Sequence, residues 1–166
     1  IDREAKNYAL RLVSHYLHDG KGNALIMGKA GRGKSHLAMA VASKLNADWR
    51  ANKQPKSILF VNLPALFIKI QNSFNRKEGM TSNEWLELLK KVDYLILDDL
   101  GRSDNAQWKQ DFLYSLLDER EATIITTNLV GSEMKSLFET GLVSRITKGG
   151  RDLYFKYPDN AEDRRK

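Results

Sequence analysis

In the stretch GKAGRGKSHL, residues 28–37, the last of three spaced glycines is followed by a lysine and a serine. It follows the apolar run ALIM and precedes a helical pattern, which is the strand, loop and helix context of a phosphate-binding loop. Glycines allow positive φ and a close approach of the backbone, whose N–H groups can surround phosphate oxygens. Lys34 would reach the β- and γ-phosphates, and the Ser35 hydroxyl would ligate Mg²⁺. The predicted nucleotide-binding residues are Gly28, Lys29, Ala30, Gly31, Arg32, Gly33, Lys34, Ser35 and His36.

Acidic and polar residues end two further apolar runs. YLILDD places Asp98 and Asp99 after four apolar residues, and TIITTN ends in Asn128. Because the carboxyl ends of parallel strands share one edge of a sheet, these side chains would lie beside the phosphates. Asp98 would hold Mg²⁺, Asp99 would orient or deprotonate the attacking water, and Asn128 would hold that water near the γ-phosphate. The structural alternatives are a pair of helix-capping acids and an ordinary asparagine at a strand exit.

Five short apolar runs predict strands that alternate with helices. The strands are predicted over 23–28, 58–62, 94–99, 122–128 and 152–157. Apolar spacing predicts helices over 34–51, 62–74 and 106–120, and Thr81 with Glu84 forms a capping box before WLELL. Strands alternating with helices indicate a parallel sheet covered on both faces. The predicted fold class is therefore α/β, in three layers.

The composition is that of a globular chain with a basic excess. The 166 residues carry a net charge of +6, which is compatible with nucleic-acid binding, and no cysteine, which excludes disulfides and thiolate metal sites. No apolar run approaches the ~20 residues of a membrane helix, so we expect a cytoplasmic protein without membrane contact. We expect one domain, with a linker helix over 1–20, a core over 21–157 and a short tail over 158–166.

Together, these motifs resemble those of an AAA+ ATPase. GKAGRGKS is similar to Walker A, YLILDD to Walker B, TTN to sensor 1 and SRI to the arginine-finger box. LILDDLG, then a Trp-bearing helix ending in LLDER, then ATIITTN, resembles the bacterial or phage helicase loaders of the DnaC/DnaI type. The IstB-type transposition helper ATPases are close relatives of that group. The similarity covers residues 5–157.

The resemblance implies a fold and an activity. The fold would be a P-loop AAA+ core with a five-stranded parallel sheet, strand order 5-1-4-3-2, without the C-terminal helical lid. The ligands would be ATP or ADP with Mg²⁺, and the activity a slow, Mg²⁺-dependent ATP hydrolysis. Lys34, Asp99, Asn128 and Arg145 would be catalytic, with Arg145 reaching the γ-phosphate of a neighbouring subunit. Asp99 replaces the glutamate of most AAA+ enzymes, which favours slow turnover.

The resemblance also implies partners. The group loads the hexameric replicative helicase onto single-stranded DNA during replication initiation or restart, with nucleotide between self-associated subunits. The helicase contact would lie in a region missing from this chain. A helix after the second strand lines a DNA pore in related initiators, and residues 63–80 are the candidate here. The candidate phosphate contacts are Lys69, Arg76 and Lys77. Phe67 or Phe74 could stack on bases, although their spacing with Ile70 favours the core.

Three alternatives remain open at this point. The nearest is an IstB-like transposition helper that acts on duplex DNA. A P-loop small-molecule kinase would need an acceptor-binding Asp/Arg pair and an arginine-rich lid, and the sequence has no lid-like insertion. A nucleotide-bound adaptor with negligible catalysis stays open as an alternative because of Asp99 and the missing lid.

Overall fold

The computed structural model describes residues 3–76 and 79–160. For Arg76 it describes the backbone but not the side chain. Helices, strands and short 3-10 turns alternate along the chain. In order they are α1 (Arg3–Leu17), β1 (Gly22–Met27), α2 (Lys34–Ala51), β2 (Ile58–Asn62), α3 (Leu63–Arg76), α4 (Ser82–Lys91), β3 (Tyr94–Leu100), η1 (Arg102–Asn105), α5 (Gln107–Glu119), β4 (Ala122–Thr127), α6 (Gly131–Leu137), α7 (Thr140–Ile146), η2 (Arg151–Leu153) and β5 (Tyr154–Lys156).

The five strands form one parallel sheet in the order β2-β3-β4-β1-β5. This is the predicted order 5-1-4-3-2 read from the other edge, so the predicted topology is confirmed. The pairs β1–β4 and β2–β3 are in regular register, with Met27 of β1 opposite Thr127 of β4 and Asn62 of β2 opposite Asp98 of β3. The segments that follow these strands therefore meet at the carboxyl edge of the sheet.

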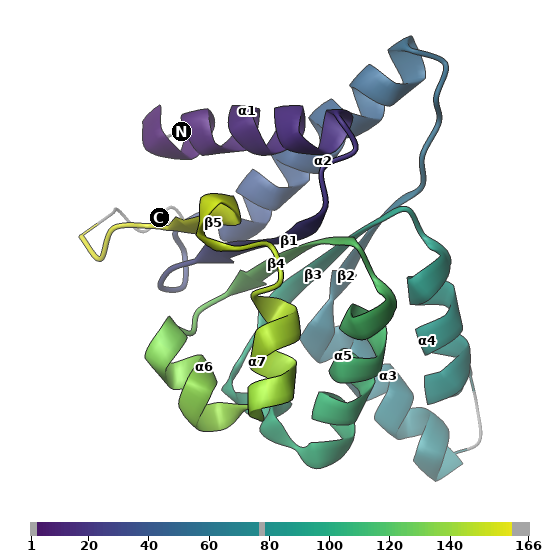
Figure 1. Cartoon of the computed structure of the whole chain (residues 1–166). Coiled ribbons are helices and arrows are strands. Elements are labelled where there is room, and N and C mark those ends of the chain that lie inside the picture. Colours follow the sequence, from purple (N-terminus) through teal and green to yellow (C-terminus); the bar gives the residue numbers. More distant parts are fainter. Residues whose placement is uncertain (1–2, 77–78, 161–166) are drawn as a thin grey trace.

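Helices cover both faces of the sheet. Helices α1 and α2 lie on one face, and α3 to α7 lie on the other (Figure 1). Alternate residues of each central strand enter opposite cores: Ile96 packs with α1 and α2, while Leu95 and Leu97 pack on the opposite face. Burial on both faces explains why these strands are almost continuously apolar. The three-layer α/β prediction is confirmed.

The predicted boundaries differ from the observed ones mainly at strand ends. The last strand was expected over 152–157 but covers only Tyr154–Lys156, because a 3-10 turn occupies Arg151–Leu153. Strand β4 ends at Thr127, so Asn128 follows the strand, and β3 continues past the two acids to Leu100. The capping box is confirmed: the Thr81 hydroxyl accepts from the Glu84 N–H, and the Glu84 carboxylate accepts from the Thr81 N–H. Among the described helices, none has the length and apolar character needed to span a bilayer.

Candidate nucleotide site

The glycine-rich loop between β1 and α2 has the backbone geometry of an anion cradle. Gly28, Gly31 and Gly33 have φ values of 152°, 77° and 87°, which L-residues with side chains rarely adopt. A side chain at Gly28 would also place its Cβ 2.9 Å from the Cβ of Tyr157. Gly33 is the N-cap residue of α2 and provides no side-chain cap, and the first N–H groups of a helix lack intrahelical partners. These N–H groups are suited to bind phosphate oxygens.

Lys34 lies at the centre of a hydrogen-bonded chain that joins three segments. Its side chain is buried, and Nζ donates to the Lys29 carbonyl at 3.0 Å and to Asn128 Oδ1 at 2.7 Å. Asn128 Nδ2 donates in turn to Asp99 Oδ1 at 3.1 Å. The structure thus brings together three of the four residues predicted to be catalytic, from α2, from β3 and from the residue after β4.

The two acids lie at an irregularity in β3. Leu97 is opposite Ile125 and Leu100 is opposite Thr127, so Asp98 and Asp99 together face the single residue between those partners. Such a two-against-one arrangement is a β-bulge, which bends the strand and changes the direction of side chains. Asp99 has φ 66°, the left-handed region that residues other than glycine rarely adopt. Asp98 is buried, whereas Asp99 is half-buried and its carboxylate contacts Asn128.

The donor set at this edge fits a nucleotide with Mg²⁺. The predicted metal ligands Ser35 and Asp98 offer hydroxyl and carboxylate oxygens, which Mg²⁺ prefers. The residues that the structure describes contain no cluster of three or more His, Cys, Asp or Glu suited to a metal. Mg²⁺ is commonly held by one or two protein groups together with phosphates. Arg32 Nε is buried without a hydrogen-bond partner among the described residues, and a phosphate oxygen could supply the acceptor.

The other predicted loop residues lie at its surface. Lys29, Ala30 and His36 are exposed, and Ser35 at the second position of α2 is half-buried. Their assignment to nucleotide binding stays a prediction.

Arg145, the fourth residue predicted to be catalytic, lies elsewhere. Its carbonyl accepts from Asn23 Nδ2 at 2.7 Å, near the start of β1. The phosphate loop follows the other end of β1, about 15 Å away at roughly 3.3 Å per residue. The Arg145 guanidinium pairs with Asp118 at 2.8 Å and stacks 4.2 Å from the ring centre of Tyr114. Arg145 is therefore too far from the phosphate loop of its own chain to contact a nucleotide there.

The predicted DNA contacts lie on or after α3. Lys69 is exposed and lies over the ring of Trp85, 5.9 Å from its centre. The Arg76 side chain and Lys77 lie outside the described part of the structure. Phe67 and Ile70 are core residues, as their spacing indicated. The same expectation was wrong for Phe74, which is 55% exposed because it lies near the end of α3, with its ring edge against Trp108.

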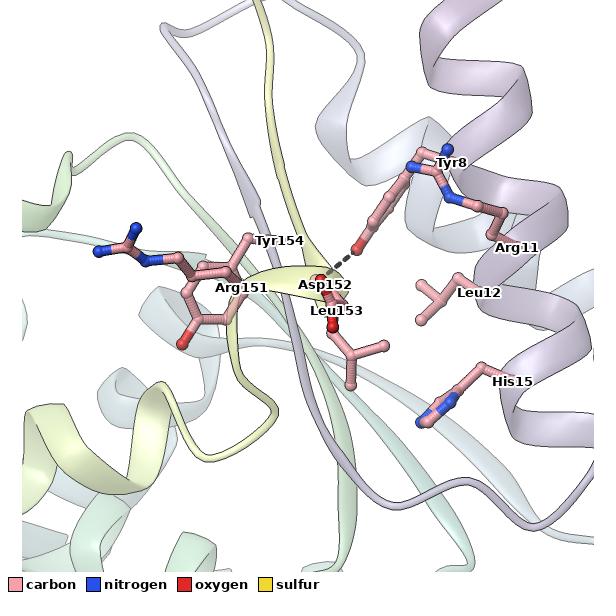
Figure 2. A pocket seen from close by; sticks show the side chains of 8 residues that line it. All are labelled: Tyr8, Arg11, Leu12, His15, Arg151, Asp152, Leu153 and Tyr154. Atoms are coloured by element: carbon pink, nitrogen blue, oxygen red, sulfur yellow. Dashed lines mark hydrogen bonds between the residues drawn. The ribbon is translucent and has the colours of Figure 1, made fainter.

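A cavity of about 520 Å³ lies apart from the phosphate loop. Figure 2 shows that α1 forms one wall and the η2–β5 segment the other. The lining residues are Tyr8, Arg11, Leu12, His15, Arg151, Asp152, Leu153 and Tyr154. Tyr8 donates to the Leu153 carbonyl at 2.8 Å, and burial raises its pKa, which keeps the hydroxyl protonated. None of the predicted phosphate-loop residues 28–36 lines this cavity.

Sequence reasoning missed three neighbours of the predicted residues. Thr126 contacts both acids, Tyr157 packs on Gly28, and Asp118 holds Arg145. Of these three, only Thr126 could have been found from the sequence, because a threonine near the end of a buried strand needs a hydrogen-bond partner. The other two contacts join segments whose proximity depends on the tertiary fold.

Comparisons with known sequences agree with the phosphate-loop interpretation. A family model described as IstB-like ATP binding protein matches residues 5–146. The uncharacterized protein YdaV of Escherichia coli K12 is 28% identical over 165 residues, covering 95% of this chain and 63% of that protein. The replicative helicase loader DnaC of Escherichia coli K12 is 25% identical over 156 residues, covering 90% and 61%. This chain therefore spans less than two thirds of the length of these curated relatives.

Solved structures of replication proteins have the same fold. A crystal structure of DnaI, 27% identical, aligns with a TM-score of 0.67 over 98% of this chain and 83% of that chain. AMPPCP-bound DnaA from Aquifex aeolicus, 21% identical, aligns with a TM-score of 0.73 over 99% of this chain and 50% of that chain. The fold is that of a P-loop AAA+ protein.

Proposed function

The chain belongs to the family of IstB-like ATP-binding proteins, and we propose that it is the ATPase core of a loader for the replicative DNA helicase. The hydrogen-bonded chain from Lys34 through Asn128 to Asp99 supports the ATPase part of this proposal. The relation to DnaC supports the loader part. The loader would act in the cytoplasm, during replication initiation or restart, and would bind single-stranded DNA and the hexameric helicase.

Each residue of the site has a distinct role in the proposed hydrolysis. The loop N–H groups and Lys34 would bind the phosphates, and Lys34 would exchange its present acceptors for phosphate oxygens. Ser35 and Asp98 would hold Mg²⁺, which neutralises charge on the transferred phosphoryl group. Asn128 would hold the attacking water, and Asp99 would accept its proton. The short Asp99 side chain, with one methylene fewer than glutamate, favours slow turnover.

The position of Arg145 supports hydrolysis at an interface between subunits. The residue is too far from its own phosphate loop, is half-buried and is already fixed by Asp118 and Tyr114. A guanidinium held in this way could contact the γ-phosphate of a neighbouring copy and spread its charge over the phosphate oxygens. Nucleotide between subunits would then link ATP to assembly.

Mixing two inactive variants tests this arrangement. Asp99→Asn keeps Arg145 but loses the proton acceptor, whereas Arg145→Ala keeps its own site but lacks the guanidinium. We expect each variant alone to hydrolyse ATP slowly and the mixture to recover part of the wild-type rate. Arg50→Ala removes an exposed arginine from the end of α2 and serves as the charge control. A mixture that stays inactive, or a fully active Arg145→Ala, would contradict action between subunits.

Fluorescence anisotropy of labelled oligonucleotides tests the DNA part. We expect an ATP analogue, more than ADP, to strengthen binding to single strands, and Lys34→Ala to abolish that gain. Lys69→Ala should weaken single-strand binding, whereas Lys44→Ala, on a helix across the sheet, should not. Absence of DNA binding in every nucleotide state would remove the DNA claim for this chain.

A transposition helper that acts on duplex DNA is the second candidate, and the IstB-like family match favours it. The same anisotropy measurement separates the two functions. Nucleotide-dependent preference for duplex over single strands would support the helper and contradict the loader.

A further inference from the structure

We propose that Thr126 is a positioning residue that sets the geometry of both acids, Asp98 and Asp99, for Mg²⁺-dependent ATP hydrolysis. The inference rests on the proposed ATPase function and adds to it a residue outside the predicted nucleotide site. Thr126 lies in β4, whereas both acids lie in the neighbouring strand β3.

The strand register gives Thr126 its special position. Between the pairs Leu97–Ile125 and Leu100–Thr127, strand β3 has two residues and strand β4 has one. Thr126 is that single residue, and Asp98 and Asp99 are the two it faces. A bulge leaves the additional residue without a regular ladder partner, so its N–H needs another acceptor.

One hydroxyl meets that need and reaches the other acid as well. The Asp99 N–H donates to Thr126 Oγ1 at 2.9 Å, and Thr126 Oγ1 donates to Asp98 Oδ1 at 2.7 Å. The Thr126 side chain is 1% exposed, so water does not readily replace these bonds. A hydroxyl has one proton, and here Asp98 receives it, which leaves the oxygen lone pairs to accept from Asp99.

The two bonds have different consequences for the site. The bond to Asp98 orients the carboxylate that we assign to Mg²⁺, as outer-shell hydrogen bonds commonly do for metal ligands. The bond from the Asp99 N–H stabilises a backbone conformation, φ 66°, that an aspartate otherwise disfavours. That conformation is part of the bulge that places the Asp99 carboxylate against Asn128. Thr126 thus couples the metal-binding acid to the water-activating acid.

Three substitutions separate the hydroxyl from the packing of the side chain. Thr126→Val keeps the branched shape and removes the hydroxyl, whereas Thr126→Ser keeps the hydroxyl and removes the methyl group. Thr123→Val is the matched control, because Thr123 is equally buried in β4 but its hydroxyl accepts from Arg120 Nε at 3.0 Å. We expect Thr123→Val to lower thermal stability without affecting the response to Mg²⁺.

The experiment measures binding of a fluorescent ATP analogue during a Mg²⁺ titration, together with the hydrolysis rate and the melting temperature. For Thr126→Val we expect about tenfold more Mg²⁺ at half-maximal enhancement of nucleotide binding, and about tenfold slower hydrolysis. Its nucleotide affinity in EDTA should equal that of the wild type. Thr126→Ser should stay close to the wild type in all three measurements.

Two results would overturn the inference: a normal Mg²⁺ response and rate in Thr126→Val, or a Thr126→Ser variant as impaired as Thr126→Val. If Thr126→Val does not fold, Thr126→Ala replaces it, and a normal Mg²⁺ response there has the same meaning. A wild-type chain that binds no nucleotide would instead overturn the proposed function itself, so the two failures are distinguishable.

Discussion

Charged side chains are buried at both ends of strands β3 and β4, but their hydrogen-bond partners differ between the two ends. At the amino end, Arg120 is 4% exposed, and all of its nitrogens donate to oxygen atoms of the protein. The acceptors are Thr123 Oγ1 and the carbonyls of Leu89, Lys90, Val92, Asp93 and Ala122, at 2.8–3.5 Å. Burial lowers the pKa of Arg120 to about 10. Within the described residues, none of the ion pairs includes Arg120.

At the carboxyl end, the polar groups contact one another and also solvent. Asn128 is exposed and Asp99 is half-buried, so a ligand or water can reach the amide of Asn128 and the carboxylate of Asp99. Lys34 is held by a carbonyl and an amide oxygen, acceptors that a phosphate could replace. Saturated hydrogen bonding at Arg120 fixes the fold, whereas exchangeable hydrogen bonding around Asn128 suits binding and catalysis. Substitutions at the two ends should therefore separate stability from activity.

Asp99→Asn should have the largest effect of these substitutions. It should lower the rate of ATP hydrolysis and leave the stability of the fold unchanged. The amide keeps the size of the side chain but removes the proton acceptor, so we expect hydrolysis to fall about 10²–10³-fold. That factor corresponds to about 3–4 kcal/mol of transition-state stabilisation. Steady-state phosphate release gives the rate, and urea unfolding should show a nearly unchanged free energy. A variant that keeps the wild-type rate would mean that Asp99 is not the proton acceptor.

Arg120→Met should have the opposite profile. It leaves several buried carbonyls without donors, and we expect the free energy of unfolding to fall by about 3 kcal/mol. Nucleotide affinity should be unchanged where the variant is folded, because Arg120 lies at the far end of β4 from the phosphate loop. Urea unfolding and nucleotide titration measure the two properties. Arg120→Lys restores part of the hydrogen bonding, so its free energy of unfolding should lie between those of Arg120→Met and the wild type. Equal stability of Arg120→Met and the wild type would contradict a stabilising role for the hydrogen bonds of Arg120.

Asp93, also at the amino end, should make a smaller and pH-dependent contribution. Hydrogen bonds from the Ser57 N–H and hydroxyl, at 2.7 and 2.8 Å, lower the pKa of Asp93. The unfolded chain then binds the proton more readily, so the stabilisation is present above pH ~4 and is lost as the pH falls through the folded pKa. We expect the stability difference between wild type and Asp93→Asn to increase between about pH 3 and 5 and to stay constant above. Urea unfolding across that range measures it, and a difference that is independent of pH would exclude the ionised carboxylate as its source.

The sequence predicts much of the carboxyl edge and little of the amino edge. The spacing of Gly28, Gly33 and Lys34, and the acids after YLIL, depend on local patterns that a sequence displays directly. The layers follow from apolar runs that alternate with helices. The strand order, in contrast, was predicted from the resemblance to AAA+ ATPases. Nothing in the sequence predicted the role of Arg120, because all but one of its acceptors are backbone carbonyls, which every residue possesses. The bulge at Asp99 depends on the register between strands, which the sequence of one strand does not determine.

Thermal unfolding of the wild type, Lys34→Ala and Arg120→Met, with and without Mg²⁺ and a slowly hydrolysed ATP analogue, tests whether nucleotide binds at the carboxyl edge of the sheet. A ligand that binds only the folded state raises the free energy of unfolding, by an amount that increases with the logarithm of the ligand concentration divided by Kd. We predict that the analogue raises the melting temperatures of wild type and Arg120→Met by similar amounts, although Arg120→Met starts from a lower value, and that it leaves Lys34→Ala nearly unchanged. Two results would contradict the assignment of nucleotide binding to the carboxyl edge. One is an increase in the melting temperature of Lys34→Ala as large as that of the wild type, and the other is the absence of an increase in Arg120→Met.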